Sequence, residues 1–297
     1  MAAVTATESP RVARRRGTVG VGTADRRHRY FTAFCVSVLV VLAAIWLVPM
    51  LWALDTSIRP EGEITASPTS WFTSHPTLDA YRKVLGAGRI PVWYLNSFLV
   101  AALSSALGVL VCSMAGFAVS RIRFRARRLA TGVILAGLMI PPQVLIMPQF
   151  QEFAGLHLLN TYWALVLTAV PTPVAVFVFV SFFDGLPEEL VDSARLDGAG
   201  WFRIYARIFM PLCRPAISAV AIFTFVWSWN SFLWPLLVMT STDTMTIPVG
   251  LSVVQDANGV HYAQVMASSV LGALPLLLVF LLFQRRIVEG IANTGIK

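Results

Sequence analysis

Six long stretches without any Asp, Glu, Lys or Arg divide this 297-residue chain. A helix needs about 20 consecutive apolar residues to cross the hydrocarbon core of a bilayer, and the shortest of these stretches has 23. Hydrophobic residues make up 57% of the chain and charged residues only 13%, far from the composition of a soluble domain. We therefore expect an all-α polytopic membrane protein with six transmembrane helices. The stretches cover residues 30–54, 90–120, 129–151, 153–183, 215–242 and 257–284.

Basic residues fall mainly on one side of this scheme. Seven arginines precede the first stretch, five lie within 121–128, four within 184–214, and three basic residues follow the last stretch. Loops rich in Lys and Arg remain in the cytoplasm, so we expect both termini to be cytoplasmic. Residues 1–29 are expected to form a disordered basic tail before a transmembrane domain over 30–297. The positive charge then reflects topology, and no nucleic-acid partner is expected.

The chain offers few side chains for catalysis or metal binding. Its three cysteines and four histidines lack the paired spacing of a disulfide framework or a zinc site. Neither lysine, Lys83 or Lys297, stands in the G-x-x-x-x-G-K-[ST] pattern that holds ATP phosphates. We expect no catalytic residue, no metal and no cofactor on this chain. Any ATP-driven step would use ATP and Mg on partner subunits.

The six stretches also lack the ionisable side chains that ion-coupled transporters place at membrane depth. Sodium can be held by carbonyls and hydroxyls alone, so an ion-coupled secondary transporter of a small polar solute remains an alternative. The lack of charge favours an energy source outside the chain.

The longest connection on the basic side, residues 184–214, has the features of a short helix followed by a turn. Pro187 and Glu189 suit the first turn of a helix that ends near Leu196. Gly198 can then adopt the positive φ that often follows a helix C-terminus.

A second short helix is expected after this turn. Apolar residues recur at helical spacing from Trp201 to Ile208, and Pro211 should end or kink the helix. Two short helices joined by a glycine form a unit that can transmit force between spans. An amphipathic segment on the lipid surface is the alternative, but five acidic residues within 184–214 disfavour binding to anionic lipid.

The sequence from Asp192 to Ala199, followed by Ile208 to Pro211, resembles the EAA loop of ABC importer permeases. The family pattern reads E-A-A, three residues, G, about nine residues, then I-x-L-P. This chain departs from it at Asp192, Ser193 and Met210. In that family the loop docks as a coupling helix on the ATPase subunit. The resemblance implies an ATPase-coupling role for Glu189, Asp192, Ala194, Asp197, Gly198, Ala199, Ile208 and Pro211.

Four further motifs, in order along the chain, resemble the maltose-transporter-type (MalG-like) carbohydrate permeases. They lie within 96–124, 139–163, 229–236 and 283–290. The resemblance implies the type I ABC importer permease fold and a place in a bacterial cell membrane. It implies a homologous second permease, an ABC ATPase dimer and an external solute-binding protein as partners. The expected substrate is a disaccharide or oligosaccharide, with glycerol 3-phosphate as an alternative.

Polar and aromatic residues in the fifth stretch are candidates for a sugar path. Trp227, Asn230, Ser231 and Trp234 have the i, i+3, i+4, i+7 spacing of one helical face. Sugars need hydrogen-bonding groups together with aromatic faces. Alternatively, Asn230 bonds a neighbouring helix, and the tryptophans pack in the bundle or lie at the membrane interface.

Prolines in the third and fourth stretches predict broken or kinked helices. They are Pro141, Pro142 and Pro148, then Pro171 and Pro173. Between the last two stretches, the resemblance implies a segment that faces the solute-binding protein. Its candidate contacts are Gln255, Asp256, Asn258, His261 and Tyr262.

Overall fold

The computed structural model describes residues 21–67, 69–87, 89–257 and 261–294, and every regular element within them is helical. The chain forms two compact units, residues 1–52 and 53–297. In its described part, the first unit consists of most of helix α1 (Val21–Ser57).

Most of the basic tail expected over 1–29 lies outside the described residues, whereas residues 21–29 already belong to α1. The helix begins before the hydrophobic stretch because residues 23–29 contain no proline or glycine to stop it.

Three helices in the described residues are long and apolar enough to cross a membrane, and three bent helix pairs meet the same criterion together. Counted as one crossing each, the pairs bring the total to six, but the third pair includes Trp201–Leu212, which precedes the fifth charge-free stretch and carries Arg203 and Arg207. The single helices are Arg29–Ser57, Ile90–Arg121 and Tyr262–Leu282. The pairs are Arg127–Met139 with Pro142–Gly155, Tyr162–Ala169 with Pro173–Asp184, and Trp201–Leu212 with Arg214–Trp229.

Prolines lie at all three bends. Helix α5 (Arg127–Met139) ends before Pro141, and the 3-10 turn η1 (Pro142–Leu145) leads into α6 (Ile146–Gly155). The segment Pro142–Gly155 is bent by 96° from α5. Helix α7 (Tyr162–Ala169) gives way to α8 (Pro173–Asp184) at 43°. Proline lacks the backbone N–H and restricts the residue before it, and the predicted breaks are confirmed.

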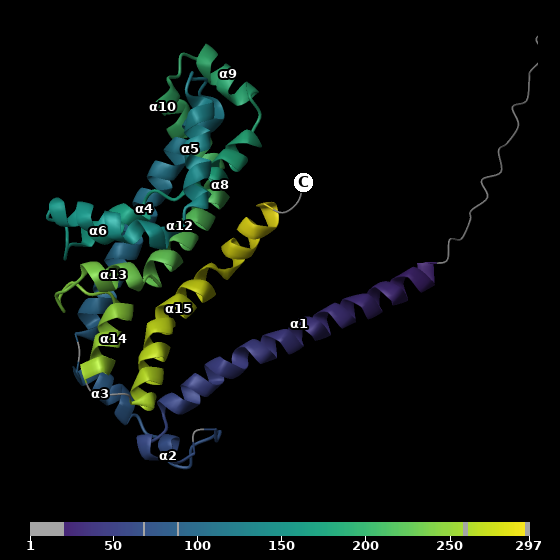
Figure 1. The fold of residues 1–297 in the computed structure, drawn as a ribbon. Coiled ribbons are helices and arrows are strands. Elements are labelled where there is room, and N and C mark those ends of the chain that lie inside the picture. The colour runs from purple at the N-terminus through teal and green to yellow at the C-terminus, as the bar shows by residue number, and fades with distance from the viewer. Residues whose placement is uncertain (1–20, 68, 88, 258–260, 295–297) are drawn as a thin grey trace, which may run out of the picture. The chain divides into compact units, whose positions relative to one another are not determined.

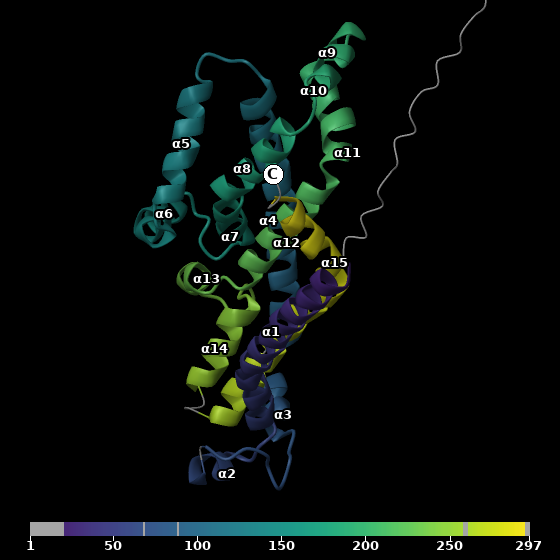
Figure 2. The same ribbon diagram turned by 90° about the vertical axis from the view of Figure 1, so that its right-hand side faces the viewer.

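Helix α4 (Ile90–Arg121) lies at the centre of the second unit and packs against α7, α8, α12 (Arg214–Trp229) and α14 (Ile247–Ala257). Figures 1 and 2 show α4 running beside α8 and α12. A glycine permits the closest approach to α8: a β-carbon on Gly116 would lie 2.7 Å from Cβ of Phe179. Apolar cores form around Trp93 and around Phe117, near the two ends of α4.

The remaining helices flank this centre. Helices α2 (Glu61–Ala66) and α3 (Asp79–Ala87) pack on α15 (Tyr262–Thr294), and α13 (Leu233–Val238) packs on α7. Between α8 and α12 lie α9 (Glu189–Leu196), α10 (Trp201–Ile204), the π-helical turn η2 (Tyr205–Phe209) and α11 (Met210–Leu212).

Candidate functional site

Residues 184–214, which we call the helical knob, form a compact unit beside the C-terminal end of α4. Helix α9 ends at Leu196, and Gly198 then adopts a φ of 75°. The Gly198 N–H donates to the carbonyl of Arg195, and the Arg195 guanidinium lies 3.9 Å from the centroid of the Trp201 ring. These contacts join α9 to α10. The predicted pair of short helices with a glycine between them is confirmed.

The second half of the knob differs from the single helix expected up to Pro211. Helix α10 passes into the π-helical turn η2 before the short α11. In a continuous α-helix, the ring of Pro211 would collide with the carbonyl of Arg207. A π-helical turn directly before the proline widens the backbone and avoids this collision. After Leu212 the chain bends by 81° into α12, as expected of a helix that ends near Pro211.

The base of the knob is an aromatic core built on Phe117 of α4. The ring of Phe117 lies 5.1 Å from that of Phe209 and 5.5 Å from that of Tyr205. Such distances and the tilted geometries suit favourable aromatic pairs. The ring centroids of Phe183 and Trp201 lie 5.9 and 6.2 Å from that of Phe117. The knob is therefore fixed to α4 by aromatic side chains of its second half.

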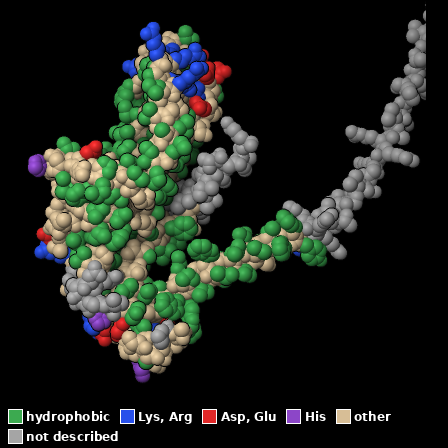
Figure 3. Space-filling view, in the orientation of Figure 1, with side chains coloured by type: hydrophobic (Ala, Val, Ile, Leu, Met, Phe, Trp, Pro, Cys, Tyr) green, Lys and Arg blue, Asp and Glu red, His purple; other side chains and the backbone are tan. Residues whose placement is uncertain are grey.

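The predicted coupling residues divide into an exposed group and a packed group. Figure 3 shows acidic and basic side chains gathered at the end of the second unit where α9 and α10 lie. The exposed residues are Glu189, Asp192, Asp197, Gly198 and Pro211. The residues packed on the aromatic core are Ala194, Ala199 and Ile208.

Two strongly exposed apolar residues on the knob are absent from the sequence-based candidates. Leu196 is 90% exposed and Phe202 is 73% exposed. Both flank charged residues, Leu196 between Arg195 and Asp197 and Phe202 before Arg203. A large apolar residue next to charged residues is the sequence signal that could have identified Leu196 and Phe202 as site residues. The knob thus combines a packed base, a charged surface and two apolar side chains in solvent.

The sequence spacing predicted that the four candidates for a sugar path share one helical face. In the structure they do not, because they lie on both sides of a helix break. Helix α12 ends at Trp229, and α13 begins only at Leu233. Asn230 caps α12, where its Nδ2 donates to the carbonyl of Val226 at 2.9 Å. Asparagine and serine compete with helical hydrogen bonds through their side chains, and in a continuous helix Pro235 would lack the N–H for the Ser231 carbonyl and clash with it. These local preferences explain the break at residues 230–232.

The two tryptophans of this set have different surroundings. Trp234 donates its Nε1–H to the carbonyl of Ala164 at 3.0 Å, and its ring lies 5.9 Å from that of Phe153. Trp227 is 65% exposed and stacks on Phe223. Trp234 therefore packs within the bundle, as the alternative interpretation predicted. The exposed side chain of Trp227 is accessible to a partner or a solute. Ser231 is half-buried in the break between the helices.

Two asparagines, Asn96 buried and Asn160 half-buried, organise the opposite end of α4. Asn96 is 2% exposed; its Nδ2 donates to the carbonyls of Asp243 and Met245, and its Oδ1 accepts the Tyr162 hydroxyl at 2.7 Å. Asn160 adopts a φ of 62°. Its Oδ1 accepts hydrogen bonds from the N–H groups of Thr240 and Ser241 and from the Thr244 hydroxyl. The segment 240–247 is thus held against α4 and the start of α7.

The segment expected to face a solute-binding protein begins in the last turn of α14 and ends at Tyr262, the first residue of α15. Asn258 lies outside the described residues, and Gln255 and Asp256 fall on α14 with side chains that are not described. His261 lines a cavity of about 380 Å³ together with Arg59, His75 and Lys83, among others. Tyr262 is 50% exposed.

Helix α2 is tied to α15 through a carboxylate. Glu61 accepts hydrogen bonds from the N–H groups of Tyr262 at 2.9 Å and Ala263 at 3.1 Å. The first N–H groups of a helix have no partner within the helix, and a negative charge is favourable there. Glu61 therefore caps α15 from a segment about 200 positions away in the sequence.

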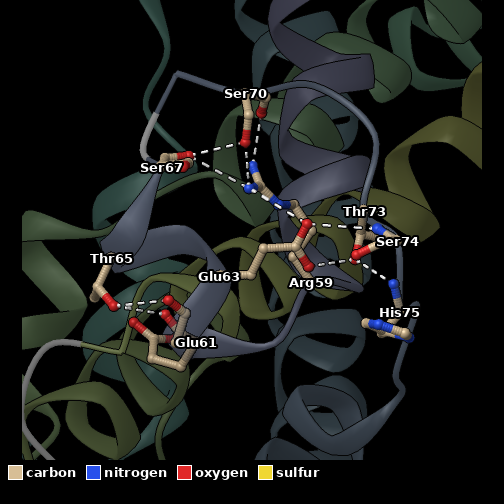
Figure 4. Close-up of polar contacts among 10 residues, drawn as sticks. Arg59, Glu61, Glu63, Thr65, Ser67, Ser70, Thr73, Ser74 and His75 are labelled. Atoms are coloured by element: carbon tan, nitrogen blue, oxygen red, sulfur yellow. Dashed lines mark hydrogen bonds and ion pairs between the residues drawn. The ribbon is translucent and has the colours of Figure 1, made fainter.

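The loop after α2 closes around a buried arginine (Figure 4). Arg59 is 1% exposed and donates to the carbonyls of Ser67 and Ser70. Glu63 accepts hydrogen bonds from the hydroxyl of Thr73 and the N–H of Ser74. The hydrogen bond from Thr73 is the main cause that lowers the pKa of Glu63 below its ordinary value of 4.5.

Within the described residues, no three His, Cys, Asp or Glu side chains converge to hold a metal ion. The arrangement instead has an exposed, charged surface at the knob end of α4 and a hydrogen-bonded segment at the other.

Comparison with known proteins identifies relatives over most of the chain. Residues 106–291 match the family model described as binding-protein-dependent transport system inner membrane component. The arabinooligosaccharides transport system permease protein AraQ of Halalkalibacterium halodurans is 36% identical over 86% of this chain and 93% of its own length. The diacetylchitobiose uptake system permease protein NgcG of Streptomyces coelicolor is 34% identical over 91% of this chain and 90% of its own length.

The fold also matches a solved structure. A bacterial ABC transporter involved in the import of the acidic polysaccharide alginate superimposes with a TM-score of 0.74 at 19% identity. The match covers 88% of this chain and 97% of that one.

Proposed function

Because the chain belongs to the family of binding-protein-dependent transport system inner membrane components, we propose that it is a permease subunit of a sugar ABC importer. Its place is the bacterial cell membrane. It forms part of the translocation path and is not an enzyme. ATP and Mg are bound by partner subunits, and six spans place both termini in the cytoplasm.

The helical knob is the site at which an ATPase dimer drives this subunit. The observation that carries this proposal is the exposure of Leu196 and Phe202 on a unit whose base is packed against α4. Large apolar side chains in a charged, exposed unit mark an interaction surface. Asp192, Asp197 and Arg203 surround them with exposed charges that can fix the register of docking.

The opposite end of the second unit is proposed to face the solute-binding protein. His261 and Tyr262 lie there, beside the capped start of α15. The segment 240–247, held by Asn96 and Asn160, lies close to the same end of α4. A homologous second permease would complete the path, with exposed apolar faces on the spans as the contact surface.

The substrate is proposed to be a disaccharide or an oligosaccharide. Named relatives handle arabinooligosaccharides, diacetylchitobiose and trehalose or maltose. Another relative is the sn-glycerol-3-phosphate permease UgpE of Escherichia coli, 32% identical over 89% of this chain. The uncharged spans favour a neutral sugar, and Trp227, Asn230 and Ser231 are the candidates on this subunit to line its path.

Purification of the tagged chain from its own cells tests this function. We expect an ATPase and a second permease to co-purify. Proteoliposomes containing the complex and its binding protein should accumulate a sugar from a panel of arabinotriose, diacetylchitobiose, maltose and trehalose. Vanadate should abolish uptake, and an ionophore should leave it unchanged. Uptake by the chain alone, or uptake that needs an ion gradient and no ATP, would contradict the proposal and favour a secondary transporter.

A further inference from the structure

Arg121 differs from the other arginines in the connection between α4 and α5. Arg123 and Arg125 are exposed, as expected of basic residues that only set membrane topology. Arg121 is half-buried, and its Nη2 donates to the backbone carbonyls of Phe183 and Leu186. Topology requires a positive charge at this place, but it does not require these two acceptors.

The two carbonyls lie on either side of the turn by which α8 enters the knob. Helix α8 ends at Asp184, and the distance from Arg121 Nη2 to the carbonyl of Leu186 is 2.6 Å. Carbonyls at a helix C-terminus lack helical partners, and a positive charge there is favourable. The adjacent Ser120 also donates its hydroxyl to the Asp184 carboxylate. The end of α4 therefore holds this turn by charge-assisted hydrogen bonds, which are the stronger kind.

The same face of α4 also holds the second half of the knob. Ser113, Phe117 and Arg121 are spaced by four residues and so share one face of the helix. The hydroxyl oxygens of Ser113 and Tyr205 are 2.8 Å apart. The Arg121 guanidinium lies 5.3 Å from the centroid of the Phe209 ring, within the range of a cation–π interaction. One stripe on α4 thus contacts both ends of the knob.

Arg121 forms no ion pair with any described carboxylate. Replacing it with a neutral residue therefore leaves no buried acid unpaired, so the variant should still fold. Its contacts are backbone carbonyls and an aromatic ring, which fix a position rather than balance a charge.

We infer that Arg121 is a positioning residue for energy coupling. It locks the turn between α8 and α9 to α4, so that a displacement of the knob moves α4 with it. At the other end of α4, Asn96 and Trp93 hold the backbone of residues 242–245. A displacement of the knob thus reaches that segment through one helix of about 45 Å. The inference rests on the proposed function, because it assumes that the knob is driven by an ATPase.

The test compares two variants that remove the same charge from the same connection, Arg121→Gln and the matched control Arg123→Gln. Each is purified as the full complex and reconstituted with the binding protein. The readout is the number of sugar molecules accumulated per ATP hydrolysed, for the panel sugar that the wild-type complex transports. For Arg121→Gln we expect this ratio to fall at least about tenfold, since one of the two lost charge-assisted hydrogen bonds would suffice for that change. Complex assembly and ATP hydrolysis should stay within about twofold of wild type, and Arg123→Gln should match wild type in all readouts.

A wild-type ratio for Arg121→Gln, or an equal fall for both variants, overturns the inference. If Arg121→Gln does not assemble, Arg121→Lys decides. Lysine keeps the charge but cannot form the same planar two-acceptor contact, so we expect an intermediate ratio, and a wild-type ratio overturns the inference. Failure of the proposed function is distinct, since the wild-type complex would then contain no ATPase.

Discussion

Gly116 is the position where α4 and α8 approach most closely, and its replacement by alanine should separate them. The new β-carbon would lie 2.7 Å from Cβ of Phe179 and 3.2 Å from the carbonyl oxygen of Val176. Favourable carbon contacts need about 3.5–4.0 Å. Neither atom can move away by a change of rotamer, because both are fixed to the backbone of α8. The helices themselves must therefore shift.

The cost can be bounded by a second glycine. Overpacking a well-packed contact costs about 1–3 kcal/mol, whereas Gly→Ala inside a helix gains up to about 1 kcal/mol from helix propensity. A β-carbon on Gly132 in α5 would have no atom within 4 Å, so Gly132→Ala should show the gain alone. The difference in the free energy of unfolding between the two variants is then the strain, about 1–3 kcal/mol.

Thermal unfolding of the detergent-purified chain measures this difference. One kcal/mol corresponds to about 2–4 °C in the midpoint for domains of 150–250 residues. We expect Gly116→Ala to unfold several degrees below Gly132→Ala. Equal midpoints for the two variants would refute the close contact between α4 and α8 and the central position of α4.

Three further predictions concern the knob and the loop after α2. Gly198→Val should prevent co-purification of the ATPase, because a β-branched residue is strained at a φ of 75°; Gly200→Val should not, since Gly200 has an extended backbone at φ −76° and ψ 162°. Phe202→Asp should weaken ATPase co-purification at least about tenfold, as expected for an interface anchor, without changing the thermal midpoint, because Phe202 is 73% exposed; an unchanged yield of ATPase would argue against docking at this residue. The lowered pKa of Glu63 means that its contribution to stability is present above pH 4.5 and is lost as the pH falls through the lowered pKa. Protease cleavage of the 67–78 loop should therefore rise in that acidic range, and in Thr73→Val, which lacks the main hydrogen bond to Glu63, the rise should begin at higher pH.

Local sequence patterns were sufficient for several features of the fold. Five of the six charge-free stretches correspond to helices or helix pairs of membrane-spanning length, whereas the fifth is divided between α12 and α13. The breaks near Pro141 and Pro171 follow from the missing N–H of proline. The turn at Gly198 follows from the ability of glycine to adopt a positive φ. These features depend on residues adjacent in the chain, which a single sequence displays.

Features that depend on backbone groups far away in the sequence could not be predicted from local patterns. Arg121 counts only as a topology-setting charge in the sequence, because its acceptors are carbonyls more than 60 positions away. Trp234 has the spacing of a path residue, yet its partner is the carbonyl of Ala164. Carbonyl acceptors carry no sequence signature, so such contacts require coordinates. The helix break at Asn230 follows from neighbouring residues, but it was not predicted, because the hydrophobic stretch 215–242 continues across it.

The most direct test of the central claim is photo-crosslinking in living cells from single positions at the two ends of the second unit. A benzoylphenylalanine residue in place of Phe202 reports on the knob, and one in place of Tyr262 reports on the start of α15. We expect the probe at Phe202 to crosslink to the ATPase subunit and the probe at Tyr262 to crosslink to no ATPase. A crosslink between the probe at Phe202 and an external protein, or between the probe at Tyr262 and the ATPase, would contradict the claim that the ATPase drives this permease through the helical knob.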